Sequence, residues 1–127
     1  MVKSLESVTV FSKDARKLAD FYRVKVGLKQ TLEAEVGEKG EELFGFEFKG
    51  SASFYIMDHS KITGKNSFPD RIIINFEVDD IDQGVKKLVS AKAKLVQEKY
   101  HMQGYGYIAT FEDTDGNFFQ LVQVKSN

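Results

Sequence analysis

Apolar and polar residues alternate in short runs along most of the chain, and two segments follow a helical repeat instead. Period-two alternation predicts strands, whereas apolar residues spaced by three and four positions predict helices. The first half is predicted to form strands at 5–11, 28–35, 43–48 and 52–57. The second half is predicted to form strands at 71–78, 94–100, 107–111 and 117–124. One helix is expected after the first strand of each half, so the predicted order is βαβββ followed by βαβββ.

The two predicted helices have similar start signals, and each has one apolar face. Asp14 and Asp80 are suitable N-cap residues, because a short carboxylate side chain accepts hydrogen bonds from the first backbone N–H groups. The apolar faces contain Leu18, Phe21 and Tyr22 in the first helix, and Ile81, Val85, Leu88 and Val89 in the second. The caps are 66 positions apart, and the expected helix ends near Gly27 and Ala93 have the same separation. This regularity indicates an internal repeat.

The repeat predicts a single domain over residues 1–127 with an α+β fold. Its two modules are expected at about 1–58 and 71–127, joined by a polar linker at 59–70. A chain of 127 residues can bury a core without a disulfide or a structural metal, and this sequence has no cysteine.

Three segments resemble the signature motifs of one superfamily. Residues 7–14 read SVTVFSKD, residues 76–81 read FEVDDI, and residues 111–121 read FEDTDGNFFQL. They resemble the patterns H-V-x-L-x-V-x-D, F-x-V-D-D-[IL] and F-x-D-P-D-G-N-x-x-E-L of the glyoxalase / bleomycin-resistance / dioxygenase superfamily, also called the vicinal oxygen chelate fold. The resemblance implies two βαβββ modules, each with a curved mixed sheet that forms a half-barrel. It also implies pairing of two copies, so we expect a homodimer.

Metal-dependent members of that superfamily bind their metal through side chains on the first and last strands of each module. Carried over by motif, these positions fall at Ser7, Phe54, Ile73 and Gln120. None of the four is a histidine or a carboxylate, the ligand types that hold Mn, Fe, Ni or Zn in such sites. We therefore expect that the metal site has been lost and that the protein uses no cofactor.

The same inward positions suggest a pocket for a small molecule, with polar anchors among aromatic walls. The candidate ligand-binding residues are Ser7, Thr9, Phe54, Asn75, Glu77, Tyr105, Tyr107, Phe118 and Gln120. Glu77 has two interpretations, an inward carboxylate that serves as a general base or a solvent-exposed residue at the strand end. Tyr105 and Tyr107 flank Gly106, so this segment is either a mobile aromatic gate or a plain β-turn.

The chain has two histidines, His59 and His101, and both fall at the ends of predicted strands. Their spacing matches no metal-binding motif, so we interpret them as loop residues rather than as a relocated metal site or a general base.

Charge and composition exclude several classes of function. The net charge is −1 with acids and bases interspersed, which gives no basic surface for nucleic acid. No apolar run is long enough to span a membrane, and the N-terminus lacks the apolar core of a signal peptide. Together with the missing cysteines, this pattern predicts a cytoplasmic protein.

Two functions remain open. The first is a metal-independent binding protein that holds a small aromatic or cationic molecule in an aromatic-lined pocket. The second is an enzyme of the same superfamily, a lyase, isomerase or dioxygenase, with a non-standard metal site or with Glu77 as general base.

Overall fold

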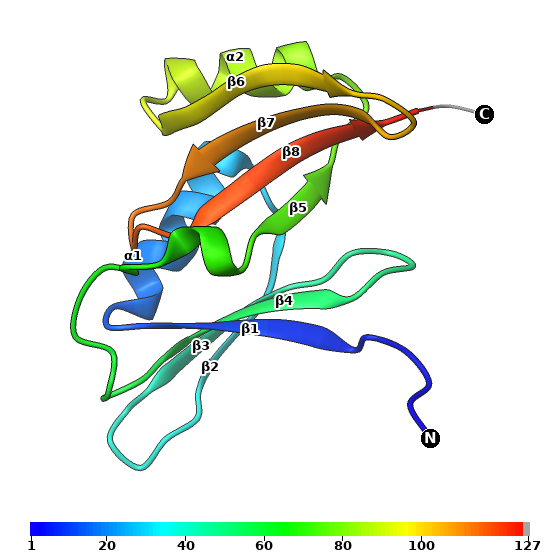
Figure 1. Cartoon of the computed structure of the whole chain (residues 1–127). Coiled ribbons are helices and arrows are strands. Elements are labelled where there is room, and N and C mark those ends of the chain that lie inside the picture. Colours follow the sequence, from blue (N-terminus) through cyan, green and yellow to red (C-terminus); the bar gives the residue numbers. More distant parts are fainter. Residues whose placement is uncertain (126–127) are drawn as a thin grey trace. The chain divides into compact units, whose positions relative to one another are not determined.

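A computed structural model describes residues 1–125 and divides the chain into two compact units, Met1–Gly64 and a second that begins at Lys65 (Figure 1). The boundary falls inside the predicted linker at 59–70. Organisation as a single domain of two modules stays a prediction.

The first unit contains one four-stranded sheet, sheet A, with a helical segment after its first strand. Its elements are β1 (Ser7–Ser12), α1 (Ala15–Asp20), the π-helical turn η1 (Phe21–Val26), β2 (Gln30–Glu35), β3 (Glu42–Phe46) and β4 (Ser53–Asp58). The strand order is β1-β4-β3-β2, with β1 parallel to β4 and the other pairs antiparallel.

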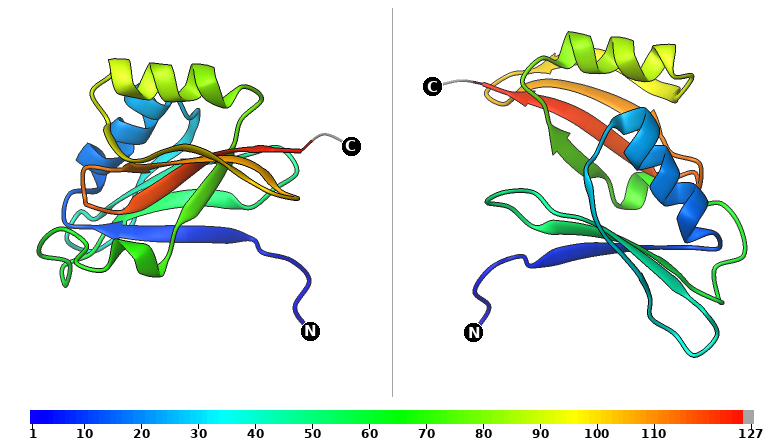
Figure 2. Two further views of the ribbon diagram at one scale, coloured as in Figure 1. Left: turned by 45° about the horizontal axis from the view of Figure 1, so that its top comes forward. Right: turned by 180° about the vertical axis from the view of Figure 1, so that it is seen from behind.

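The second unit repeats this topology in sheet B. Its elements are the 3₁₀ turn η2 (Pro69–Arg71), β5 (Ile74–Glu77), α2 (Ile81–Ser90), β6 (Lys94–Met102), β7 (Gly106–Glu112) and β8 (Phe118–Val124). The strand order is β5-β8-β7-β6, with β5 parallel to β8. Figure 2 shows α2 lying along this sheet from two further sides.

The expected α+β fold of two βαβββ modules is therefore confirmed. Most strand boundaries differ by one or two residues, and the largest difference is at β5, which was predicted from residue 71 and begins at Ile74. Pro69 stands at the start of a 3₁₀ turn that continues to Arg71. Proline fixes φ near the value that such a turn needs, so Arg71 belongs to the turn instead of the strand, and the backbone becomes extended only from Ile72.

The two expected helix caps are confirmed. The Asp14 side chain accepts a hydrogen bond from the Lys17 backbone N–H at 3.1 Å, and Asp80 accepts one from Gln83 at 3.2 Å. Each carboxylate satisfies one of the backbone donors that the start of a helix leaves without an intrahelical partner.

The helix ends differ from the expectation. The residues with left-handed backbone after the helices are Gly27 (φ 87°) and Lys92 (φ 63°), which are 65 rather than 66 positions apart. The first helical segment therefore has one more residue than the second. Its last turn is π-helical, with the Gly27 N–H donating to the Tyr22 carbonyl oxygen five residues back at 2.9 Å. A π-turn takes up more residues than an α-turn, so it accommodates the additional residue.

Within the part of the chain that the structure describes, no helix has the length and apolar character needed to cross a membrane.

Candidate functional site

Strand pairing in sheet A divides the predicted site residues between two faces. Directly paired residues project to the same side of a sheet, and alternate residues project to opposite sides. Ser7 pairs with Ser53 and Thr9 pairs with Tyr55, whereas Phe54 pairs with Val8. Phe54 therefore lies on the face opposite to Ser7 and Thr9.

The expectation that Phe54 shares a face with Ser7 is wrong, because Phe54 packs beneath the helix. Its ring makes an edge-to-face contact with Tyr22, with centroids 5.1 Å apart, and stacks on Phe46 at 5.9 Å. Its side chain is 3% exposed. These contacts make Phe54 part of the core between α1 and sheet A.

The cause of this error is the one-residue difference between the helices. Phe46 and Phe54 stack at 5.9 Å in the first unit, and Phe111 and Phe119 stack at the same separation in the second. Phe54 is thus the equivalent of Phe119, and the residue equivalent to Gln120 is Tyr55. Aligning the last strands with an offset of 66 instead of 65 exchanges the two faces, because side chains alternate with a period of two.

The face of sheet A opposite α1 is mainly apolar and aromatic. Phe11 of β1, Met57 of β4 and Leu43 of β3 are aligned across these neighbouring strands by direct pairing. Tyr55 lies over Gly45, where an added Cβ would come within 2.9 Å of the Tyr55 ring. Tyr55 was not predicted from the sequence. The signal that identifies it is the equal spacing of eight residues in the pairs Phe46/Phe54 and Phe111/Phe119, which makes Tyr55 the equivalent of Gln120.

In sheet B, α2 covers the face that carries Leu121 and Gln123. A Cβ added to Gly84 of α2 would lie 2.8 Å from a Leu121 methyl carbon, and the Ile81 backbone N–H donates to the Gln123 side-chain oxygen at 2.9 Å. The opposite face contains four of the predicted site residues. They are Asn75, Glu77, Phe118 and Gln120.

A line of polar side chains crosses this opposite face. Direct pairing joins one residue from each strand, and we call this set the polar row: Asn75 of β5, Gln120 of β8, Thr110 of β7 and Gln97 of β6. The Gln120 Nε2 group donates a hydrogen bond to the Thr110 hydroxyl oxygen at 2.9 Å. Thr110 is 5% exposed, whereas Asn75 is exposed and Gln120 is half-buried. Thr110 was not predicted, although its position two residues from Ile108, on the same face of β7, is visible in the sequence.

The residues beside the polar row differ on its two sides. On one side, Glu77, Val122, Ile108 and Tyr100 form the next paired line. On the other side, Phe118 pairs with Glu112, and the Glu112 carboxylate lies 3.6 Å from the Lys94 ammonium. Glu77 is the last residue of β5 and is exposed. This placement agrees with the second interpretation of Glu77, a solvent-exposed residue at the strand end.

Tyr107 projects to the α2 side of sheet B, away from the polar row. It pairs with Gln123 and His101, its ring lies 5.0 Å from the His101 ring, and the Lys99 ammonium is 5.1 Å from its centroid. Lys99 also contacts Asp82 at 2.8 Å, and this hydrogen bond raises the pKa of Lys99. Tyr107 therefore does not share a face with Asn75 and Gln120.

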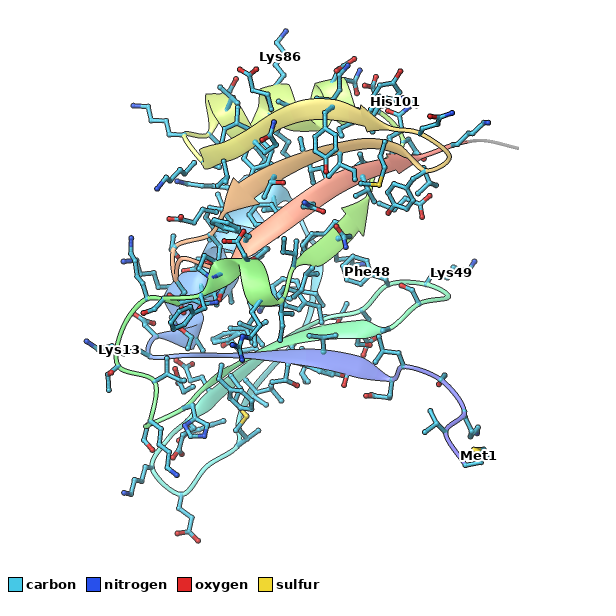
Figure 3. All side chains as sticks on the ribbon, in the orientation of Figure 1. Met1, Lys13, Phe48, Lys49, Lys86 and His101 are labelled. Carbon is cyan, nitrogen blue, oxygen red and sulfur yellow. The ribbon has the colours of Figure 1, made fainter. Side chains whose placement is uncertain are left out.

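The segment Tyr105-Gly106-Tyr107 forms a turn and the start of β7. The Tyr105 N–H donates to the Met102 carbonyl at 3.0 Å, and the Tyr105 carbonyl accepts from Lys125 at 2.8 Å. Gly106 is required by close packing, since a Cβ there would collide with the Gln123 carbonyl oxygen. An open notch of about 350 Å³ beside this turn is lined by residues that include His101, Tyr107 and Lys125. His101 is labelled in Figure 3.

The two histidines make local contacts. His59 packs edge-to-face on Phe11 at 5.2 Å, and its Nδ1 accepts the Lys61 backbone N–H at 3.1 Å. His101 is exposed near the end of β6.

The residues at the family's metal positions do not fit a transition metal. With Tyr55 in place of Phe54, these positions are Ser7, Tyr55, Ile73 and Gln120. Ser7 and Tyr55 offer hydroxyl oxygens, Gln120 offers a neutral amide oxygen and Ile73 offers no ligand atom, whereas Mn, Fe, Ni and Zn sites in proteins use imidazole nitrogen and carboxylate oxygen. Among residues 1–125, no three histidine, aspartate or glutamate side chains come together as a metal-binding group.

Comparison with known proteins gives the family. A sequence profile of the Glyoxalase/Bleomycin resistance protein/Dioxygenase superfamily matches residues 4–121. The chain is also 27% identical over 121 residues to the uncharacterized protein YetH of Bacillus subtilis (strain 168), covering 95% of this chain and 98% of YetH.

Solved structures with the same fold include two proteins whose names concern antibiotics. TnmS3, an antibiotic binding protein from Streptomyces sp. CB03234, is 22% identical with a TM-score of 0.76, and the match covers 98% of each chain. The fosfomycin resistance protein FosX from Listeria monocytogenes is 19% identical with a TM-score of 0.72, covering 98% of this chain and 96% of FosX. On the strength of the profile match and the repeated βαβββ topology, the chain belongs to the glyoxalase / bleomycin resistance protein / dioxygenase superfamily.

Proposed function

We propose that this protein binds a small aromatic or cationic molecule without a metal, and that the polar row of sheet B contacts the ligand. The observation that carries the proposal is the hydrogen bond from Gln120 to Thr110. Gln120 stands at the family's closing carboxylate position, and this hydrogen bond holds its amide in place. A neutral amide suits hydrogen bonding to a ligand better than coordination of a metal.

The aromatic and apolar neighbours of the polar row support a binding surface of this kind. Phe118, Tyr100 and Val122 lie on the same face, and small-molecule sites combine apolar walls with a few placed polar groups. An antibiotic binding protein and a fosfomycin resistance protein share the fold, which makes recognition of a small molecule a reasonable function for it.

The experiment that tests metal independence is elemental analysis of protein purified without a histidine tag and without a chelator. We expect less than about one tenth of an equivalent of Mn, Fe, Ni or Zn per chain, because the donor set is neutral. Near-stoichiometric metal would overturn the proposal. The metal-free protein is then screened for small-molecule binding, with Gln120→Leu as the test variant and Gln83→Leu, an exposed glutamine of α2, as its control.

A second candidate function is a metal-free enzyme that uses Glu77 as general base. It is favoured by the placement of Glu77 two residues from Asn75 on the same face of β5. A Glu77→Gln variant that keeps its fold should lose turnover of any substrate found, while a binding protein keeps its affinity for the ligand.

The same proposal includes one domain over residues 1–127 and a homodimer in solution. Light scattering coupled to gel filtration tests the dimer, since a mass near 14.4 kDa would identify a monomer.

A further inference from the structure

We infer that the polar row selects an uncharged ligand that carries a hydrogen-bond acceptor and a hydrogen-bond donor about 5 Å apart, the spacing of neighbouring strands. The inference rests on the proposed function, because it specifies the ligand for the same face of sheet B. Three features of the row carry it: the groups that remain available, their spacing and the absence of charge.

The available groups are two neighbouring amides. The Gln120 Nε2 group uses one proton for Thr110, and no other hydrogen bond of the Gln120 amide is found within residues 1–125. The Asn75 side chain has no hydrogen bond to the part of the chain that the structure describes. Each amide therefore still offers an acceptor oxygen and at least one donor N–H.

The spacing of these groups follows from the strand pairing. Asn75 and Gln120 are directly paired on parallel strands, and so are Gln120 and Thr110 on antiparallel strands. Side chains paired across neighbouring strands are roughly 5 Å apart at Cβ. A benzene ring with two polar substituents in meta positions presents its substituent atoms at a similar interval.

The row has no ionisable member, and the charges near it offer little to a charged ligand. Glu112 already lies 3.6 Å from Lys94, on one side of the row. Glu77, on the other side, is exposed to solvent, so water screens the attraction of its carboxylate for a cation. A charged ligand would lose hydration without gaining a close counter-charge, whereas a neutral one exchanges water hydrogen bonds for amide hydrogen bonds.

Three ligands that differ in charge but share a ring and a meta hydroxyl test the inference. They are 3-hydroxybenzamide (neutral), 3-hydroxybenzoate (anionic) and 3-(aminomethyl)phenol (cationic) at pH 7. Each is titrated into the ¹⁵N-labelled full chain, and the side-chain amide signals of Asn75 and Gln120 report binding at the row. We expect 3-hydroxybenzamide to bind at least about tenfold more tightly than either charged compound.

Variants separate the row from the rest of the surface. Gln120→Leu removes the central amide at similar volume and should weaken 3-hydroxybenzamide at least about fivefold, the effect of losing one hydrogen bond. The matched change Gln83→Leu on α2 should leave the affinity unaltered.

The outcomes distinguish this inference from the proposed function. If 3-(aminomethyl)phenol or 3-hydroxybenzoate shifts the row signals at equal or lower concentration, selection for a neutral ligand is wrong, while small-molecule binding at this face stands. If none of the three ligands shifts the Asn75 and Gln120 signals, the inference and the proposed location of the site both fail.

Discussion

Asp58 of β4 and Gln123 of β8 occupy equivalent positions in the two units, and each accepts a hydrogen bond from the first backbone N–H of its unit's helix. The Asp58 Oδ1 atom lies 2.8 Å from the Ala15 nitrogen, and the Gln123 Oε1 atom lies 2.9 Å from the Ile81 nitrogen. In both units a side chain of the last strand thus ties the helix to the sheet. Asp58 also accepts the Glu42 N–H at 2.9 Å, so it additionally anchors β3.

Asp58→Ala should therefore destabilise the protein more than Gln123→Ala. We expect a loss of about 2–3 kcal/mol in the free energy of unfolding for Asp58→Ala, because two backbone donors lose a charged acceptor, and about 1 kcal/mol for Gln123→Ala. Urea unfolding followed by circular dichroism measures both. Asp58→Asn is the control, since its single carbonyl oxygen can satisfy one of the two donors and should give an intermediate loss. Equal effects of Asp58→Ala and Gln123→Ala would contradict this account.

Replacing Lys92 with glycine should stabilise the folded protein. It has φ 63°, a left-handed conformation that costs a residue with a Cβ about 1–2 kcal/mol and costs glycine little. Lys92→Gly should raise the free energy of unfolding by about 0.5–1 kcal/mol. The same change at Lys86, which projects from α2 in Figure 3, should lower it by about 1 kcal/mol, because glycine is unfavourable inside a helix. A destabilising effect at both positions would refute the left-handed backbone at Lys92.

The sequence was sufficient to predict the elements and their order. Caps at Asp14 and Asp80 and strand alternation are local signals, and the structure confirms them. The apolar face predicted for the second helix is confirmed at Ile81 and Leu88, whereas Val89 is exposed. The placement of Asn75 and Gln120 on one face followed from the family positions Ile73 and Gln120, together with alternation from Ile73 to Asn75.

The face occupied by Phe54 could not be predicted from alternation alone, because it depends on an alignment between the two units. The additional residue of the first helical segment lies in the π-turn after Asp20, where the apolar spacing of Phe21 and Tyr22 also fits an α-helix. A shift of one residue there moves Phe54 under α1 and places Tyr55 on the opposite face.

Phe54 and Phe119 should contribute alike to stability, as equivalent members of two stacked pairs. Phe54→Ala and Phe119→Ala should each cost about 3–5 kcal/mol of the free energy of unfolding, the usual range for removing a buried aromatic ring. Phe11→Ala is the control, since Phe11 is 43% exposed and buries less apolar area. We expect about 1 kcal/mol for it. Should Phe54→Ala lose ligand affinity while keeping wild-type stability, the original interpretation as a pocket residue would be correct.

Thr110 should act on ligand binding through Gln120. Thr110→Val keeps the side-chain shape but removes the hydroxyl oxygen that accepts the Gln120 Nε2 hydrogen bond, so the amide is no longer held in one orientation. We expect affinity for 3-hydroxybenzamide to fall about five- to tenfold, the equivalent of one hydrogen bond, together with a change in the Gln120 side-chain amide signals before any ligand is added. Thr110→Ser retains the hydroxyl and should restore both. An unaltered Gln120 amide signal in Thr110→Val would show that the Thr110 hydroxyl, which is 5% exposed, does not orient the amide.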